Sequence, residues 1–119
     1  MRSGGSGTPV QGICPDGWHI PSQEEWAVLD AYDAAHLQST DHWLNSTGTN
    51  ATGFNSRPAG KYDSATGMFT GLYGFTGYWA SDDTPGTSAN AFILNYYCDT
   101  LEESLILKAD GLSVRCVMD

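Results

Sequence analysis

The last third of the chain, residues 77–119, determines the fold class, and it reads GYWASDDTPGTSANAFILNYYCDTLEESLILKADGLSVRCVMD. Three runs within it have the apolar, β-branched and aromatic content of short strands, namely residues 91–97, 104–109 and 113–117. Polar and acidic residues fill the connections between these runs, as is usual for loops. The sequence therefore predicts a scaffold of antiparallel strands that presents a loop-rich surface.

The residues upstream of this region predict helices and a hairpin that support the strands. Ser22 and Glu25 form a capping box, so a helix is expected to start at Gln23 and to direct Trp26 toward the core. A second, short helix is expected at residues 42–44 and a first strand at residues 10–14. A hairpin is expected around the turn at residues 63–67, with its return strand at residues 68–70. The predicted class is α+β, with one or two helices packed on short antiparallel strands and long loops.

Length and charge limit the organisation and the partners of the chain. Its 119 residues suffice for one domain, expected at residues 10–119, after a Gly/Ser-rich linker or expression scar at residues 1–9. Fourteen Asp and Glu against five Lys and Arg give a net charge of −9, which repels phosphates and makes nucleic acid an unsuitable partner. No apolar run is long enough to insert into a membrane. There is no signal peptide, so a signal for export would lie outside this sequence.

The three cysteines, Cys14, Cys98 and Cys116, suggest one disulfide. Cys14 and Cys116 lie at the two ends of the expected domain, and a bridge between them would add roughly 4–5 kcal/mol to stability in the chain-entropy model. Such a bridge indicates an oxidising compartment; the alternative is a pair of buried, reduced thiols. Cys98 has no basic neighbour in the sequence to lower its pKa, so it is not expected to act as a nucleophile.

Four stretches resemble one known family. Residues 12–22 followed by Glu25-Trp26, then residues 53–54 with 58–60, then Gly77-Tyr78-Trp79 with Ser81, and finally residues 111–117 resemble, in order and spacing, the Fibrobacter succinogenes major paralogous domain. The resemblance implies a C-type lectin-like fold, of the branch that includes formylglycine-generating enzyme, on secreted or surface-exposed bacterial proteins. It also implies a relation to the variable proteins of diversity-generating retroelements, in which positions near the C-terminus are rewritten at adenines.

The chain departs from these relatives at informative places. Tyr78-Trp79-Ala80-Ser81 replaces a more usual Trp-Trp-Ser-Ser, and the calcium- and sugar-binding triplets of true C-type lectins are absent. An oxidase of the formylglycine-generating type needs a catalytic cysteine pair, which a Cys14–Cys116 bridge would remove. Residues 82–101 contain no Glu, Lys, Gln, Met or Trp, the residues that randomising the adenines of an AAC codon cannot produce. This absence fits retroelement diversification, and it also fits chance.

Strand alternation defines a candidate binding face. If Leu94 and Tyr96 point inward, the residues between and beside them point outward. The candidate ligand-binding residues are Asp82, Asp83, Thr84, Ala91, Ile93, Asn95, Tyr97, Thr100, Glu102 and Trp79. Tyr97 is the expected anchor because an aromatic ring offers large contact area, and Trp79 is either core or the floor of the face. In the alternative register, shifted by one residue, Ile93 and Tyr97 belong to the core.

Other features have structural explanations in the sequence. Leu105-Ile106-Leu107 is expected to be a strand buried on both sides, and Arg115 is expected to bond loop carbonyls. The acidic residues Asp82, Asp83, Asp99, Glu102 and Glu103 are either a calcium site or, more simply, a solvated rim. No catalytic motif is found, so the predicted function is not enzymatic. It is a surface module that binds a protein or glycan ligand on a cell or host surface, outside the cell. The alternatives are a structural module of a surface assembly and, less favoured, an oxidase of the formylglycine-generating type.

Overall fold

The computed structural model describes residues 10–44, 48–82 and 86–119, and its architecture is α+β, with short helices and antiparallel strands in small sheets. The expected linker at residues 1–9 and the expected site residues Asp83 and Thr84 lie outside the described residues. The elements in chain order are β1 (Trp18–His19), α1 (Gln23–Ala27), the 3-10 helix η2 (Val28–Ala31), α2 (Ala34–Leu37), β2 (Lys61–Asp63), β3 (Met68–Thr70), β4 (Phe75–Trp79), β5 (Ser88–Asn95), β6 (Glu102–Leu107) and β7 (Val117–Met118).

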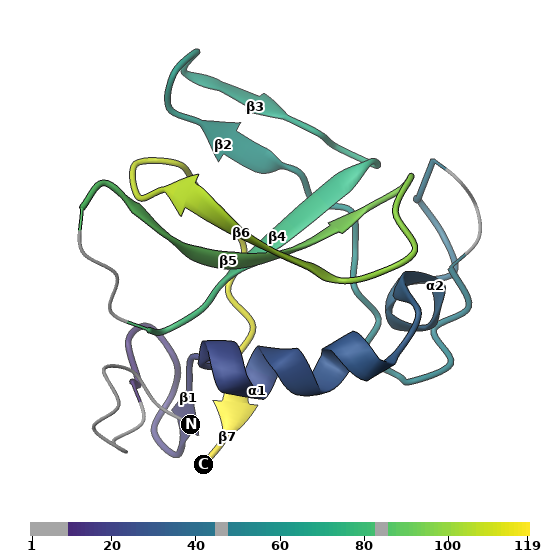
Figure 1. Cartoon of the computed structure of the whole chain (residues 1–119), viewed down its shortest axis with the longest axis horizontal. Helices are drawn as coiled ribbons and strands as arrows, with labels where there is room; N and C mark the ends of the chain where they lie inside the picture. Colours follow the sequence, from purple (N-terminus) through teal and green to yellow (C-terminus); the bar gives the residue numbers. More distant parts are fainter. Residues whose placement is uncertain (1–9, 45–47, 83–85) are drawn as a thin grey trace.

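The centre of the molecule is a three-stranded antiparallel sheet in the order β4-β5-β6. The helices cover one face of this sheet, and the β2–β3 hairpin lies on the other side (Figure 1). β5 is the central strand, and its residues 91–95 are all buried. The strands therefore divide the molecule into a helix side, which holds the core, and a hairpin side.

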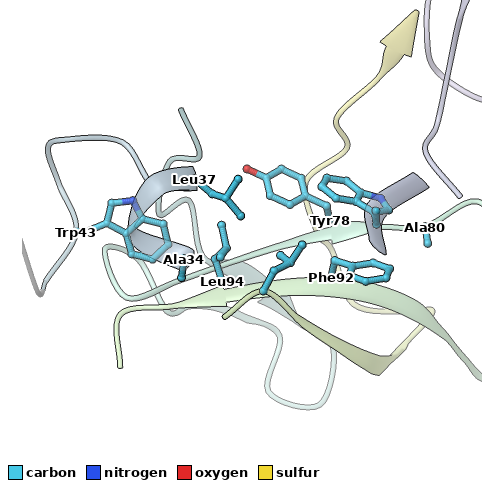
Figure 2. Packing of buried hydrophobic residues seen from close by; sticks show 9 residues of the cluster. Ala34, Leu37, Trp43, Tyr78, Ala80, Phe92 and Leu94 are labelled. Carbon is cyan, nitrogen blue, oxygen red and sulfur yellow. The ribbon is translucent and has the colours of Figure 1, made fainter. Parts of the chain in front are cut away.

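The core lies between helix α1 and the sheet. Trp26, 2% exposed, stacks on Tyr78 of β4 and on Phe92 of β5, with ring centroids 5.1 and 5.8 Å apart. Figure 2 shows Tyr78, Phe92 and Leu94 gathered in this layer with residues of α2. These sheet residues share one face because side chains alternate along each strand. The predicted core position of Trp26 is confirmed.

The predicted start of the first helix is confirmed, whereas the predicted second helix is wrong. The Ser22 side chain accepts a hydrogen bond from Glu25 N–H, and the Glu25 carboxylate accepts one from Ser22 N–H, so the capping box is complete. Residues 42–44 are not helical, because Trp43 turns into the core and donates Nε1–H to the Ser56 carbonyl at 2.9 Å. His42 has a φ of 74°, which a helix does not allow. The second α-helix is α2, at residues 34–37 instead.

The two ends of the described chain are joined to each other. β1 pairs with β7, and Cys14 is bonded to Cys116 across a sequence separation of 102 residues. The disulfide prediction is confirmed; such bonds are typical of proteins outside the reducing cytoplasm. The expected first strand at residues 10–14 is wrong, because Cys14 N–H closes a turn onto the Gln11 carbonyl. Of the strand expected at residues 113–117, only Val117 belongs to a strand.

The hairpin expected around residues 63–67 is confirmed, and polar contacts attach it to the rest of the fold. β2 and β3 pair from Lys61↔Thr70 to Asp63↔Met68. The Asp110 carboxylate accepts hydrogen bonds from Ser64 Oγ (2.6 Å), Ser64 N–H (2.9 Å) and Lys61 Nζ (3.1 Å). The Ser64 bonds, followed by Lys61, lower the pKa of Asp110 to about 2. The hairpin is therefore tied to the segment that follows β6.

His19 joins the chain ends to helix α1 through two carboxylates. It is 4% exposed; Nδ1 lies 2.7 Å from Asp119 Oδ1, and Nε2 lies 2.9 Å from Glu25 Oε2. Burial alone would lower the pKa of His19, but the hydrogen bonds and charges of Glu25 and Asp119 outweigh it and raise the pKa above its ordinary 6.5. The charged histidine thus stabilises the folded state.

We expect the free energy of unfolding to fall as the pH rises above about 6.5. A raised pKa in the folded state contributes stability below the ordinary pKa of 6.5, and this contribution is lost as the pH rises through the folded-state value. Urea unfolding between pH 5.5 and 9 measures the slope. His19→Gln should flatten it, and equal slopes in the variant and the unaltered protein would contradict the assignment.

No helix within the described ranges is long and apolar enough to cross a membrane.

Candidate binding site

The candidate face predicted from strand alternation is the hairpin side of the sheet. Ala91, Ile93 and Asn95 of β5 are paired with Trp79, Gly77 and Phe75 of β4, and Ala91 and Ile93 are paired with Ser104 and Glu102 of β6. Paired residues share a face, and this face is opposite to that of the core residue Leu94. The predicted orientation of the three β5 residues is therefore confirmed.

The predicted exposure of these three residues is wrong. Ala91, Ile93 and Asn95 are only 0%, 5% and 8% exposed. The reason lies in residues that are distant in the sequence: a methyl group added at Gly77 would lie 2.9 Å from Ile93 Cδ1 and 3.1 Å from Leu112 Cδ2. Ile93 and Leu112 thus both lie close against Gly77, and their side chains fill the space that a side chain at this position would take.

Exposure begins where β5 ends. Tyr97 is 70% exposed, as expected of an anchor, and Tyr96, predicted to point inward, is 42% exposed. The strand stops at Asn95, so alternation no longer constrains the next residues. The two tyrosine rings meet edge to face, with centroids 5.2 Å apart and planes at 88°.

A hollow of about 290 Å³ opens at this end of the sheet, and we call it the β5–β6 hollow. Its lining comes from β4, β5, the segment after β5, and β6: Phe75, Ile93, Asn95, Tyr97, Glu102, Glu103, Ser104 and Ile106. Four of the predicted site residues, Ile93, Asn95, Tyr97 and Glu102, are brought together here. The lining therefore combines apolar side chains with carboxylates and an amide.

Glu102 and Glu103 are the two charged residues of the lining; Glu102 shares a face of β6 with Ser104 and Ile106, whereas Glu103 pairs with the core residue Phe92. Asn95 Nδ2 donates to Glu102 Oε1 at 3.4 Å, which holds the amide toward the rim. Burial raises the pKa of the nearby Cys98 thiol, and the Glu102 and Asp99 carboxylates raise it further. A thiol with a raised pKa stays protonated at neutral pH and is a weak nucleophile, as expected for Cys98.

The other predicted site residues lie outside the lining of the hollow. Trp79 and Ala91 pair farther along the strands, and Thr100 is exposed in the turn before β6. The Asp82 carboxylate accepts a hydrogen bond from the backbone N–H of Gln23 at the start of α1, so it has a structural contact. The Asp82 carboxylate therefore binds the start of α1. Asp82 does not line the hollow.

Sequence reasoning missed four residues of the lining. Ser104 and Ile106 follow Glu102 at a spacing of two along β6, and Phe75 lies opposite Asn95 in the β4–β5 register. The sequence places Glu103 only in an acidic cluster. The alternation within β6 was a usable signal for Ser104 and Ile106, but Phe75 required knowledge of which strands pair.

Arg115 donates to the Phe54 carbonyl at 2.6 Å and its guanidinium lies 4.2 Å from the Phe54 ring centre, which confirms its structural role.

A hollow of about 220 Å³ is lined in part by His42, Arg57 and Tyr73, none of which was predicted as a site. Among the described residues, no three His, Cys, Asp or Glu side chains gather to hold a metal ion, and calcium binding stays a prediction.

Comparisons with known proteins place the chain in a family. The model of the Fibrobacter succinogenes major domain matches residues 6–118, which is almost the whole chain. The searches of curated proteins and of solved structures found no match. Since the family match extends over the disulfide, the central sheet and the β5–β6 hollow, the chain belongs to the Fibrobacter succinogenes major domain family.

Proposed function

We propose that the chain is a ligand-binding module of a surface-exposed protein, and that the β5–β6 hollow is its binding site. The observation that carries this proposal is the convergence of Ile93, Asn95, Tyr97 and Glu102 in one hollow. A largely exposed tyrosine beside apolar groups and hydrogen-bonding side chains is a composition enriched in recognition surfaces. The ligand would be a protein or a glycan on a cell or host surface.

The charge of the hollow limits the chemical class of ligand that it can bind. Glu102 and Glu103 line it, and the whole chain carries a net charge of −9. A ligand with cationic groups or several hydrogen-bond donors matches such a rim, whereas an anionic ligand is repelled. We therefore propose a ligand with basic or hydroxyl-rich groups at the point of contact.

The scaffold we propose is the C-type lectin-like fold. The disulfide and the β1–β7 pair, which join the two ends of the chain beneath a central antiparallel sheet, support this assignment. The same disulfide argues against the oxidase alternative, because it uses two of the three cysteines. An extracellular location follows from the proposed role and agrees with the disulfide.

Binding to a glycan array and to a phage-displayed peptide library tests the site. For each ligand found, we expect Tyr97→Ala to weaken binding at least about tenfold, because truncating a central aromatic anchor removes large contact area. Glu102→Gln should weaken cationic ligands in particular. Tyr32→Ala is the matched control, since Tyr32 is 46% exposed at the end of η2. Ligands that tolerate Tyr97→Ala as well as Tyr32→Ala would place the binding site elsewhere.

Diversification by a retroelement is a further part of the proposal, and it is tested by sequencing the locus from many individuals. Substitutions should concentrate at adenines in codons 82–110, and there at accessible positions such as Tyr97. Ala91, with 0% of its surface exposed, should stay constant because any larger side chain would have to fit into a closed space. Variation spread evenly along the gene would remove the retroelement from the proposal and leave a fixed binding module.

A further inference from the structure

Strand β6 lies at the edge of the central sheet and carries an apolar run at residues 105–107. The strand order is β4-β5-β6, so among the described residues β6 has a partner strand on one side only. Leu105 and Leu107 are 61% and 44% exposed, although the sequence predicts a strand buried on both sides for Leu105-Ile106-Leu107. The prediction is wrong because burial on both sides belongs to the central strand, which is β5. An exposed apolar edge strand is a site at which another strand can add.

The register shows which backbone N–H and C=O groups of β6 point away from β5. Lys108 N–H donates to the Thr87 carbonyl at 2.8 Å, which continues the pairing of Ser88 with Leu107. Backbone groups alternate in direction along an antiparallel strand, so the even-numbered residues of β6 bond β5. Glu103 and Leu105 direct their N–H and C=O groups to the outer edge. Within the described ranges, no other backbone group bonds to those of Glu103 and Leu105.

The charges along the strand match a second copy in the antiparallel direction. Residues 102–108 read EESLILK, with carboxylates at the start and an ammonium group at the end. A two-fold axis at Leu105 places Leu105 opposite Leu105 of the second copy and Glu102 opposite Lys108 of the second copy. A parallel arrangement would place Glu102 opposite Glu102, which is repulsive. The charge pattern therefore selects the antiparallel arrangement.

We propose that two copies of this chain associate edge to edge through β6, in antiparallel register about Leu105. The result is one continuous sheet with three strands from each copy. Glu102, Ser104 and Ile106 line the β5–β6 hollow, so both hollows face the same side of the joined sheet. Lys108 of the second copy then lies next to the acidic rim. The proposed dimer follows from the edge strand β6 alone and does not depend on the proposed binding function.

A single short strand forms a small interface, so the dimer is expected to be weak, with a Kd between about 1 μM and 1 mM. Sedimentation velocity over a range of concentrations at 0.15 M salt, where distant charges are screened, measures it. Leu105→Lys should raise the Kd at least about tenfold, because two ammonium groups meet at the axis. Leu72→Lys adds the same charge at a residue that is 60% exposed and should leave the Kd unchanged. Circular dichroism melts establish that each variant is folded.

A charge exchange tests the register. Glu102→Lys and Lys108→Glu should each weaken the dimer, and the double variant should restore it, because each pair is then reversed in sign. Hydrogen exchange gives a second readout: protection of the Leu105 amide should rise with protein concentration, while that of Ser104 should not. A protein that stays monomeric at about 1 mM, the upper end of the expected Kd, would overturn the proposal. So would equal effects of Leu105→Lys and Leu72→Lys, or a double variant as weak as the single ones.

Discussion

Replacing Cys14 and Cys116 together with serine is expected to lower the free energy of unfolding by about 4–5 kcal/mol. The disulfide closes a loop with a sequence separation of 102 residues, and a loop of this length restricts the unfolded chain strongly. The expected drop in melting temperature is roughly 10–20 °C for a chain of this size. Thermal and urea unfolding of both proteins measure the difference. Cys14 is buried and the bond lies beside the β1–β7 pair, so the chain ends should become the first part to open.

Two controls separate the disulfide from other effects of the substitutions. Reducing the unaltered protein should reproduce the loss seen in the double variant. Cys98→Ser removes the remaining thiol and should change stability far less, because Cys98 closes no loop. If the double variant and the unaltered protein melt within a few degrees of each other, the bond does not form in solution. The main support for an oxidising compartment would then be lost.

Local signals in the sequence predicted local structure well. The capping box of Ser22 and Glu25 sets the start of α1, and turn chemistry sets the β2–β3 hairpin. Both depend on residues that are close in the sequence, where the backbone geometry follows from a few side chains. The alternation along β5 also predicted correctly that Ala91, Ile93 and Asn95 share the face opposite Leu94, but it predicted wrongly that they are exposed.

Burial was harder to predict because it depends on contacts between distant segments. The runs at β5 and β6 are both apolar, yet β5 is buried on both faces and β6 lies at an open edge. Only the strand order distinguishes them, and no residue within either strand encodes that order. The same limit applies to Ile93, because both it and Leu112, which is distant in the sequence, lie against Gly77. For this reason, the sequence predicted only part of the lining of the β5–β6 hollow.

The segment around Trp43 shows how tertiary contacts override local propensity. The residues at 40–44 could cap and start a helix, but the Trp43 indole reaches the Ser56 carbonyl and the Leu44 N–H donates to the Tyr73 carbonyl. These bonds hold the segment against other parts of the chain. They replace the bonds that a short helix would make, and a helix of one turn is only marginally stable alone.

Replacing Trp26 with alanine is expected to lower the free energy of unfolding by about 3–5 kcal/mol. The indole is buried between α1 and the sheet, where it stacks on Tyr78 and Phe92 and meets Phe54 edge to face. Removing it leaves a cavity that the three remaining rings cannot close. Urea unfolding at fixed pH measures the loss, and the wavelength shift of the remaining tryptophans reports loosening of the core.

A milder substitution shows whether packing, rather than the indole N–H, is responsible. Trp26 Nε1 is buried and has no hydrogen-bond partner in the described part of the chain, so removing it leaves no group newly unsatisfied and relieves an existing cost. Trp26→Phe keeps an aromatic ring against Tyr78 and Phe92 and should cost clearly less than Trp26→Ala. A phenylalanine variant as unstable as the alanine variant would contradict this explanation. It would mean that the indole N–H contributes a hydrogen bond that stabilises the fold in solution.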